Sequence, residues 1–161
     1  MSKPDPSVRH AARPAAGPAH GELEGLDVDQ PFDGASLYGL RETLAAHAGR
    51  LGADEEQIDH LLIVASELAT NAVRHGGGAG HVRLWHHHDV LFCQVSDHGP
   101  GITDPTVGST LPDPTDGEGG RGIWICRRLT TQLSIETGPD GHGAIVTAAI
   151  PGQDRQSDTG Q

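Results

Sequence analysis

Two polar residues four positions apart, Glu67 and Asn71, stand near the end of a segment that is patterned like a buried helix. On an α-helix, residues i and i+4 lie on one face, so the carboxylate and the amide should project side by side. We place them roughly opposite the apolar stripe of this helix, on a face that begins with Ile63 and Val64 and could line a cleft. A carboxylate there can act as a general base, and an amide oxygen can ligate a hard cation such as Mg²⁺. The plainer alternative is a solvated polar end of the helix.

A second candidate is the sequence DHGPG, which begins at Asp97 and ends at Gly101. By strand alternation Asp97 shares a face with Leu91, Cys93 and Val95, so it points inward if that face packs on helices. An inward carboxylate needs hydrogen-bond donors, and the exocyclic amine of a bound base would supply one. The glycines permit a close approach of backbone and ligand. The alternative is an ordinary Asp-Gly turn that ends a strand.

A third candidate is the sequence GEGGRG, from Gly117 to Gly122, which leads into IWICRRL. It has the form G-x-G-x-x-G, but the preceding TLPDPTD contains two prolines and cannot be the buried strand that a Rossmann fold requires. What remains is a glycine-rich loop at a helix N-terminus, where backbone N–H groups and the helix dipole favour phosphate. Arg121 would add a positive charge. The alternative is a flexible loop that leads to a helix cap.

Together the three motifs supply the parts of a Mg-nucleotide site. Asp97 would bind the nucleobase, the glycine-rich loop would bind the phosphates, and Glu67 and Asn71 would serve as general base and metal ligand. The stretch between Gly99 and Gly120 has no periodic apolar residues. A loop of about 20 residues inside a compact domain is usually functional, often as a lid.

The first half of the chain predicts one strand and two helices that would hold the Glu/Asn pair. We expect an edge strand within Leu23 to Asp33, and a helix from Ala35 that Gly49 and Gly52 end. Asp54 is expected to cap a second, longer helix that runs to about His75, with Gln57 completing a capping box.

The second half predicts four strands and a third helix. Two strands within residues 81–97 should meet in a turn near His87 to Asp89, and a helix should span Gly122 to Gln132. Two last strands follow, LSIET at residues 133–137 and AIVTAAI at residues 144–150. Hairpin-connected strands with separate helices indicate an α+β fold, a two-layer α/β sandwich whose mixed, mostly antiparallel sheet carries its helices on one face.

Composition limits the class of protein. The 161 residues carry a net charge of −11, which makes direct nucleic-acid binding a poor fit and favours a basic protein partner or a metal-bound ligand. No segment resembles a signal peptide or a membrane span, so we expect a cytoplasmic protein that does not interact with membrane. Residues 1–21 and 152–161 have few large apolar side chains and are expected to be disordered tails around one domain at residues 22–151.

The order of the motifs resembles the GHKL ATPase superfamily, which includes gyrase, histidine kinases and MutL. ELATNAVRHG looks like the N box of that superfamily, DHGPGI like its first glycine box, and GGRGIWI like its second. The resemblance covers roughly Leu37 to Pro151. Within the superfamily, the wording of the boxes looks most like the anti-sigma factor serine kinases of bacterial partner-switching systems.

The resemblance implies a Bergerat-type ATP-binding fold with Mg²⁺ as a second cofactor. It gives Glu67 the role of general base and Asn71 the role of Mg²⁺ ligand, while Asp97 would bind the adenine amino group. The remaining nucleotide contacts that it implies are in the base pocket and around the phosphates: Gly99, Gly101 and Ile102 for the base, and His75, Gly120, Arg121 and Gly122 for the phosphates.

The resemblance also implies partners, and one residue departs from the family pattern. Such kinases bind a sigma factor or phosphorylate an anti-sigma antagonist of the STAS type, and they commonly form homodimers. The family often has a Gly-Thr-Thr strand whose first threonine supports the contact between aspartate and adenine, whereas this chain has Ala144 there. Two other functions therefore stay open: an ATP-binding switch that sequesters its partner without phosphotransfer, and a regulatory domain that binds a small molecule or metal without nucleotide.

Overall fold

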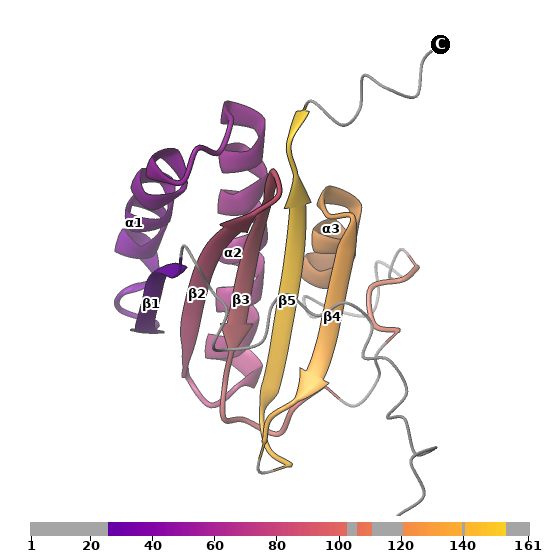
Figure 1. Ribbon diagram of the computed structural model, residues 1–161. Helices are drawn as coiled ribbons and strands as arrows, with labels where there is room; N and C mark the ends of the chain where they lie inside the picture. The colour runs from indigo at the N-terminus through magenta and orange to yellow at the C-terminus, as the bar shows by residue number, and fades with distance from the viewer. Residues whose placement is uncertain (1–25, 103–105, 111–120, 140, 154–161) are drawn as a thin grey trace, which may run out of the picture.

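The fold was described from a computed structural model, which places residues 26–102, 106–110, 121–139 and 141–153. Five strands and three helices follow one another in the order that the sequence predicts (Figure 1). Their bounds are β1 (Leu26–Asp33), α1 (Leu37–Arg50), α2 (Glu55–His75), β2 (Ala79–His87), β3 (Val90–Ser96), α3 (Arg121–Leu129), β4 (Gln132–Thr137) and β5 (Ala144–Pro151).

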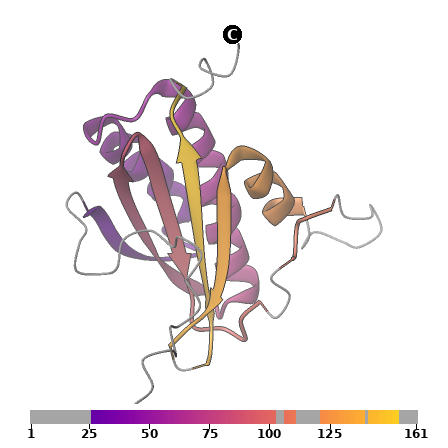
Figure 2. The same cartoon turned by 45° about the vertical axis from the view of Figure 1, so that its right-hand side comes forward.

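The strands form one sheet in the order β1-β2-β3-β5-β4. Every neighbouring pair of these described strands is antiparallel, so the sheet has no parallel pair among them. All three helices lie behind the same face of the sheet, with α2 across its middle and α3 behind β5 and β4 (Figures 1 and 2). The predicted α+β two-layer sandwich is confirmed, and the first strand lies at the edge as expected.

Helix α2 begins at a capping box, as the sequence predicts. Oδ1 of Asp54 accepts a hydrogen bond from the backbone N–H of Gln57 at 2.8 Å, and the side chain of Gln57 accepts one from the backbone N–H of Asp54 at 3.1 Å. The Gln57 amide, although buried, also donates to the backbone oxygens of Asp89 and Ile150 at 3.1 Å each. One residue therefore fixes the start of α2 against both the β2–β3 turn and the end of β5.

Two predicted helix ends need correction. Gly49 lies inside α1, and the helix ends after Arg50, where Gly52 takes a positive φ of 89°. Helix α3 ends at Leu129 rather than at residue 132, because the backbone N–H of Thr131 already donates to the oxygen of Ala149 in β5 at 3.0 Å. Gln132 then belongs to β4.

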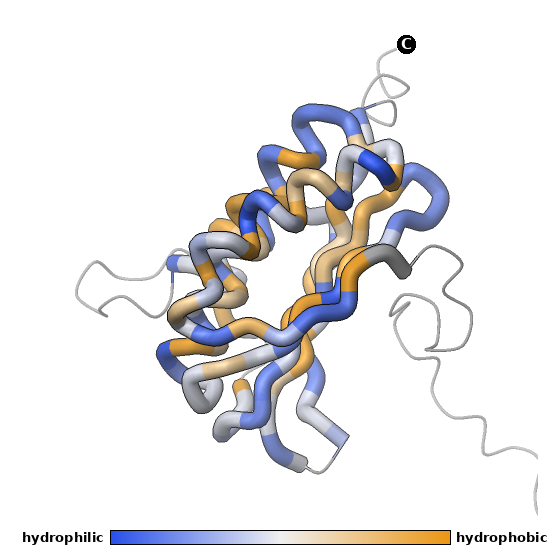
Figure 3. The backbone as a smooth tube through the Cα atoms, turned by 90° about the vertical axis from the view of Figure 1, so that its left-hand side faces the viewer, coloured by the Kyte–Doolittle hydropathy of each residue, from blue (hydrophilic) through white to orange (hydrophobic). Residues whose placement is uncertain are grey.

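The core lies between the two layers. Figure 3 shows the helical and sheet layers from the side, with apolar stretches in both. Alternate residues of the central strands point toward the helices, and they meet one face of α2. The fully buried large side chains are Leu44, Leu61, Val64, Val82, Leu84, Leu91, Cys93, Cys126 and Ile150.

The end of β5 is tied to the start of α2. The backbone N–H of Gly152 donates to the oxygen of Asp89 at 3.1 Å, and that of Gln153 donates to Oδ2 of Asp54 at 3.0 Å. The predicted tail at residues 1–21 lies outside the described residues, as does the part of the second tail after Gln153. Across the described ranges, no helix has both the length and the apolar character of a membrane span.

Candidate functional site

A cavity of about 330 Å³ opens between the end of α2, the end of β3, the start of β5 and the start of α3. Most of its wall is apolar, and Asn71, His75 and Asp97 supply its polar and ionisable side chains. The apolar side chains come from both layers and from the segment after β3: Leu68, Ala72, Val95, Ile102, Val107, Ile123, Ala144 and Val146. An apolar pocket with a few convergent polar groups is the usual form of a small-molecule site.

Asp97 follows β3 and faces into this cavity, as strand alternation predicts from the buried Leu91, Cys93 and Val95. Its Oδ1 accepts hydrogen bonds from the backbone N–H groups of Gly99 at 3.0 Å and Ala144 at 3.2 Å. These two bonds hold the carboxylate in one orientation. The carboxylate can still accept a donor from a ligand in the cavity.

Close backbone contacts bring the segment after β3 against the end of α2. A Cβ added at Gly99 would lie 2.5 Å from the Cα of Gly76, and one at Gly76 would lie 2.5 Å from Oδ2 of Asp97. Gly101 has a φ of 86°, and a Cβ there would approach the oxygen of Gly143 to 3.0 Å. Only glycine fits at these positions, where two backbone segments pass close to each other, and the segments form one wall of the cavity.

Glu67 and Asn71 meet the start of α3. A Cβ added at Gly122 would lie 2.6 Å from Oε2 of Glu67 and 3.6 Å from Nδ2 of Asn71. Asn71 lines the cavity, whereas Glu67 lies beside it, along the same face of α2. The structure thus brings Gly122 of the second glycine box together with the Glu/Asn pair, next to the cavity that Asn71 and Asp97 line.

The surroundings of this pair differ in part from the prediction of a face that lines a cleft. The start of α3 packs against this side of α2 at Gly122, and of the pair only Asn71 lines the cavity. Val64 is fully buried, and its backbone oxygen accepts a hydrogen bond from Sγ of Cys126 at 3.8 Å. Ile63, one turn before Glu67 on α2, is 41% exposed. Helix α3 therefore covers this side of α2 only in part, and the cavity opens near the end of α2.

The other predicted residues divide into three groups. His75 and Ile102 line the cavity, and so does Gly101. Arg121 is the exposed first residue of α3 and lies outside the lining. Gly120 lies outside the described residues. Several wall residues were not predicted as such from the sequence: Leu68, Ala72, Gly76, Val95, Val107, Ile123 and Val146. Of these, only Gly76 carried a signal, since it follows the end of α2 directly.

The two cysteines belong to the core beside this site. Both are free thiols, and burial raises the pKa of Cys93 to about 12. Burial, together with the nearby Glu67 carboxylate, raises the pKa of Cys126 to about 12 as well. Both thiols therefore stay protonated at neutral pH and are unsuited to act as nucleophiles or metal ligands.

The residues present fit a nucleotide with its cation. An apolar cavity suits a nucleobase, the carboxylate of Asp97 suits an amino group, and the absence of a side chain at Gly122 lets Glu67 and Asn71 approach the first turn of α3 closely. Over the described part of the chain, no three His, Cys, Asp or Glu side chains form a group that could hold a metal ion. The amide oxygen of Asn71 instead suits Mg²⁺ that takes its other ligands from phosphates and water.

Comparisons with known proteins agree with this architecture. The family described as "Histidine kinase-like ATPase domain" matches residues 31–150. A chain in the SiaB–SiaC complex from Pseudomonas aeruginosa is similar in structure, with a TM-score of 0.58 and 12% identity over 78% of this chain and 91% of that one.

A second similar structure contains the RsbU and RsbW domains of Rv1364c from Mycobacterium tuberculosis. The TM-score is 0.52 and the identity 18%, over 77% of this chain and 32% of that one, so this chain corresponds to about a third of the larger protein. No curated protein sequence matches the chain.

Proposed function

Since the chain belongs to the histidine kinase-like ATPase domain family, as the GHKL resemblance predicts, we propose that it is an ATP-dependent serine/threonine kinase of a partner-switching system. The observation that carries this proposal is the meeting of Glu67, Asn71 and Gly122 at one end of the cavity that Asp97 lines. A site that only bound a base would need no carboxylate beside the start of α3.

In this proposal ATP takes its place in the cavity with the adenine amino group at Asp97. The carboxylate is already oriented by Gly99 and Ala144, so accepting this donor costs little reorganisation. Gly101 and Ile102 border the base, and His75 lies at the wall near the end of α2. Toward the phosphates, the first turn of α3 would supply backbone N–H groups and the positive end of the helix dipole, and the exposed Arg121 would add positive charge.

Bound ATP would supply the γ-phosphoryl group, and the Mg²⁺ bound with it would neutralise the phosphate charge. Asn71 would hold the cation through its amide oxygen, and Glu67 would accept the proton from a serine or threonine hydroxyl of the partner. The hydroxyl oxygen gains the bond to phosphorus, the bond to the oxygen of ADP breaks, and the proton stays on Glu67. The N–H groups at the start of α3 would stabilise the charge that develops on the phosphoryl oxygens.

The partner that we propose is a sigma factor or an anti-sigma antagonist of the STAS type, and the protein itself would act as a homodimer. Two observations support this class of partner: the resemblance of the three sequence boxes to anti-sigma factor kinases, and the structural likeness to chains named for the SiaB–SiaC complex and for the RsbU and RsbW domains.

A second candidate is an ATP-binding switch that sequesters its partner without phosphotransfer. The observation that favours it is Ala144, which is 2% exposed and contacts Asp97 only through its backbone. A threonine hydroxyl at this position would offer a further hydrogen bond. Without that hydroxyl, fewer groups hold the adenine, so the nucleotide is positioned less firmly for phosphotransfer.

Phosphotransfer from radiolabelled ATP to a panel of STAS-domain proteins separates the two candidates. We expect the wild type to label at least one of them, and Glu67→Gln to lose the labelling while it still binds ATP. Glu55→Gln, at an exposed position of the same helix, serves as the control and should label normally. Normal labelling by Glu67→Gln would remove the assigned base, and ATP binding without any labelling would favour the switch.

A further inference from the structure

The outward face of α3 combines arginines with apolar side chains in a single stripe. Its members recur at i, i+3, i+4 and i+7, which places them on one face of the helix: Arg121, Trp124, Ile125 and Arg128. The opposite face is buried, through Gly122, Ile123 and Cys126. Arg121 and Arg128 are exposed and the two apolar residues are half-buried. We call these four residues the α3 stripe.

The α3 stripe is a local exception in an acidic protein. The chain has 11 lysines and arginines against 22 acidic residues, yet three of those basic residues lie in the nine residues of α3, which has no acidic residue. A net charge of −11 favours a basic partner, whereas this helix attracts an acidic one. The surface charge of the whole molecule therefore does not describe this face.

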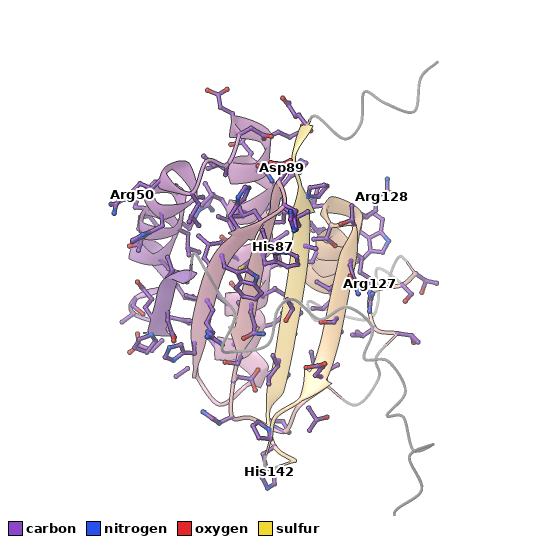
Figure 4. All side chains as sticks on the ribbon, viewed as in Figure 1. Arg50, His87, Asp89, Arg127, Arg128 and His142 are labelled. Atoms are coloured by element: carbon purple, nitrogen blue, oxygen red, sulfur yellow. The ribbon has the colours of Figure 1, made fainter. Side chains whose placement is uncertain are left out.

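Contacts within α3 hold the arginines in place. The guanidinium of Arg128 lies over the ring of Trp124, 5.3 Å from its centroid. This cation–π contact orders both side chains before a partner binds, which lowers the entropy cost of docking. Arg127 turns aside from the stripe, and its Nε donates to the backbone oxygen of Val107 at 2.8 Å. Figure 4 shows Arg127 and Arg128 at the margin of the molecule beside α3.

The stripe connects two recesses of the surface. It starts at Arg121, which precedes Gly122, the residue of α3 that packs against the Glu67 carboxylate. It ends at Arg128, which borders a hollow of about 150 Å³. That hollow also contains His60, Thr130, Thr131 and the acidic Glu56. A partner lying along the stripe would thus reach the phosphate end of the cavity on one side and a polar recess on the other.

We propose that the α3 stripe docks a helix of the partner protein that carries apolar residues between two acidic ones. Seven residues of helix rise span about 10 Å, so the two carboxylates should be about that far apart, one facing each arginine. Arginine and tryptophan are the side chains that most often dominate protein interfaces. The docking proposal does not depend on the proposed kinase function. Only the further step, in which docking brings a partner hydroxyl to Glu67, rests on that function.

The test uses two synthetic helical peptides with the full-length protein. Both present leucine at i+3 and i+4; one has glutamate and the other lysine at i and i+7. We expect the glutamate peptide to bind at least about tenfold more tightly by fluorescence anisotropy, and Arg128→Glu to reverse that preference. Arg50→Glu, at the exposed last residue of α1, should leave the preference unchanged. Trp124→Ala should weaken both peptides.

Each outcome decides a separate claim. Equal binding of the two peptides, or a preference that Arg128→Glu leaves intact, would overturn the docking proposal even if the protein proves to be a kinase. Charge-dependent peptide binding by a protein that transfers no phosphate would uphold the docking surface and overturn the kinase. If Arg128→Glu instead changes the sedimentation of the protein alone, the stripe is an interface between copies of this chain, and the proposed partner helix is wrong.

Discussion

Glu67 and Gly122 are in such close contact that any side chain at Gly122 would collide with the Glu67 carboxylate, at 2.6 Å from Oε2. The contact joins α2 to the first turn of α3, through two residues that are more than 50 positions apart in the sequence. It places the proposed base directly beside the backbone N–H groups that would hold phosphate. Several consequences of this arrangement can be measured.

Replacement of Gly122 by alanine should affect chemistry more than stability. The atom that the new Cβ would meet is the far end of the flexible Glu67 side chain, which can rotate away at low cost. We therefore expect phosphotransfer to fall by at least about tenfold, or at least about 1.4 kcal/mol of transition-state stabilisation, with a small change in melting temperature. Gly49→Ala, inside α1 with no atom within 4 Å, is the matched control and should leave phosphotransfer unchanged. Full phosphotransfer by Gly122→Ala would mean that the contact has no catalytic role.

Replacement of Gly99 should be more damaging to the fold. Here the new Cβ would lie 2.5 Å from the Cα of Gly76, and a backbone cannot rotate away. The segment after β3 would have to separate from the end of α2, with a loss of about 1 to 3 kcal/mol of unfolding free energy. Urea unfolding measures this loss, and Gly39→Ala, an open position in α1, is the control. A loss no greater than in Gly39→Ala would show that the two glycines are not packed as described.

Asp54 should make stability depend on pH. Hydrogen bonds from the backbone N–H groups of Gln153 and Gln57 lower its pKa from the ordinary value of 3.8. A lowered pKa in the folded state means that the carboxylate stabilises the fold above pH 3.8, and that this contribution is lost as pH falls through the folded-state pKa. Asp54→Ala should cost about 1 kcal/mol at pH 7 through the lost helix cap, and less at pH 3.

The pH dependence can be checked by chemical unfolding of wild type and Asp54→Ala at both pH values. Asp59→Ala, an exposed position of the same helix, is the control and should cost little at either pH. If the cost of Asp54→Ala is as large at pH 3 as at pH 7, the ionised carboxylate is not what caps α2.

The sequence was sufficient to predict α2, its capping box and the β2–β3 hairpin, because these features depend on neighbouring residues. Asp54 and Gln57 are three positions apart, and the apolar stripe of α2 repeats over its 21 residues. Helix ends were less predictable. Gly49 is tolerated inside α1, since nothing surrounds it, and the end of α3 depends on Thr131, whose partner Ala149 is 18 residues away.

The site was predictable as a set of residues but not as a geometry. The three sequence boxes identify Asn71, Asp97 and Gly122 as site residues. No local pattern shows that Gly122 packs on Glu67, or that the backbones at Gly76 and Gly99 are in close contact. These contacts depend on β5 lying between β3 and β4, which brings Ala144 to Asp97. The contact of α3 with Glu67 could not be foreseen either, because the periodicity of one helix does not reveal which other helix packs against it.

Asn71 should determine the dependence of binding on Mg²⁺. Its amide lines the cavity beside the start of α3, where an oxygen ligand would face both the cation and the phosphates. We expect Asn71→Ala to bind ATP equally with and without Mg²⁺, at the affinity that the wild type shows in EDTA. Gln132→Ala, at an exposed position of β4, should retain the dependence on Mg²⁺. If Asn71→Ala still binds ATP more tightly in the presence of Mg²⁺, groups other than Asn71 hold the cation.

Calorimetric titration of ATP into the wild type and into Asp97→Asn shows whether the cavity between α2, β3, β5 and α3 binds ATP through Asp97. A hydrogen bond to a charged group contributes about 1.5 to 3 kcal/mol, so the variant should bind at least about tenfold more weakly. Its amide oxygen can still accept from Gly99 and Ala144, so its melting temperature should stay close to that of the wild type. Equal affinities for ATP would show that Asp97 does not hold the nucleotide, and no binding by the wild type would show that the cavity is not an ATP site.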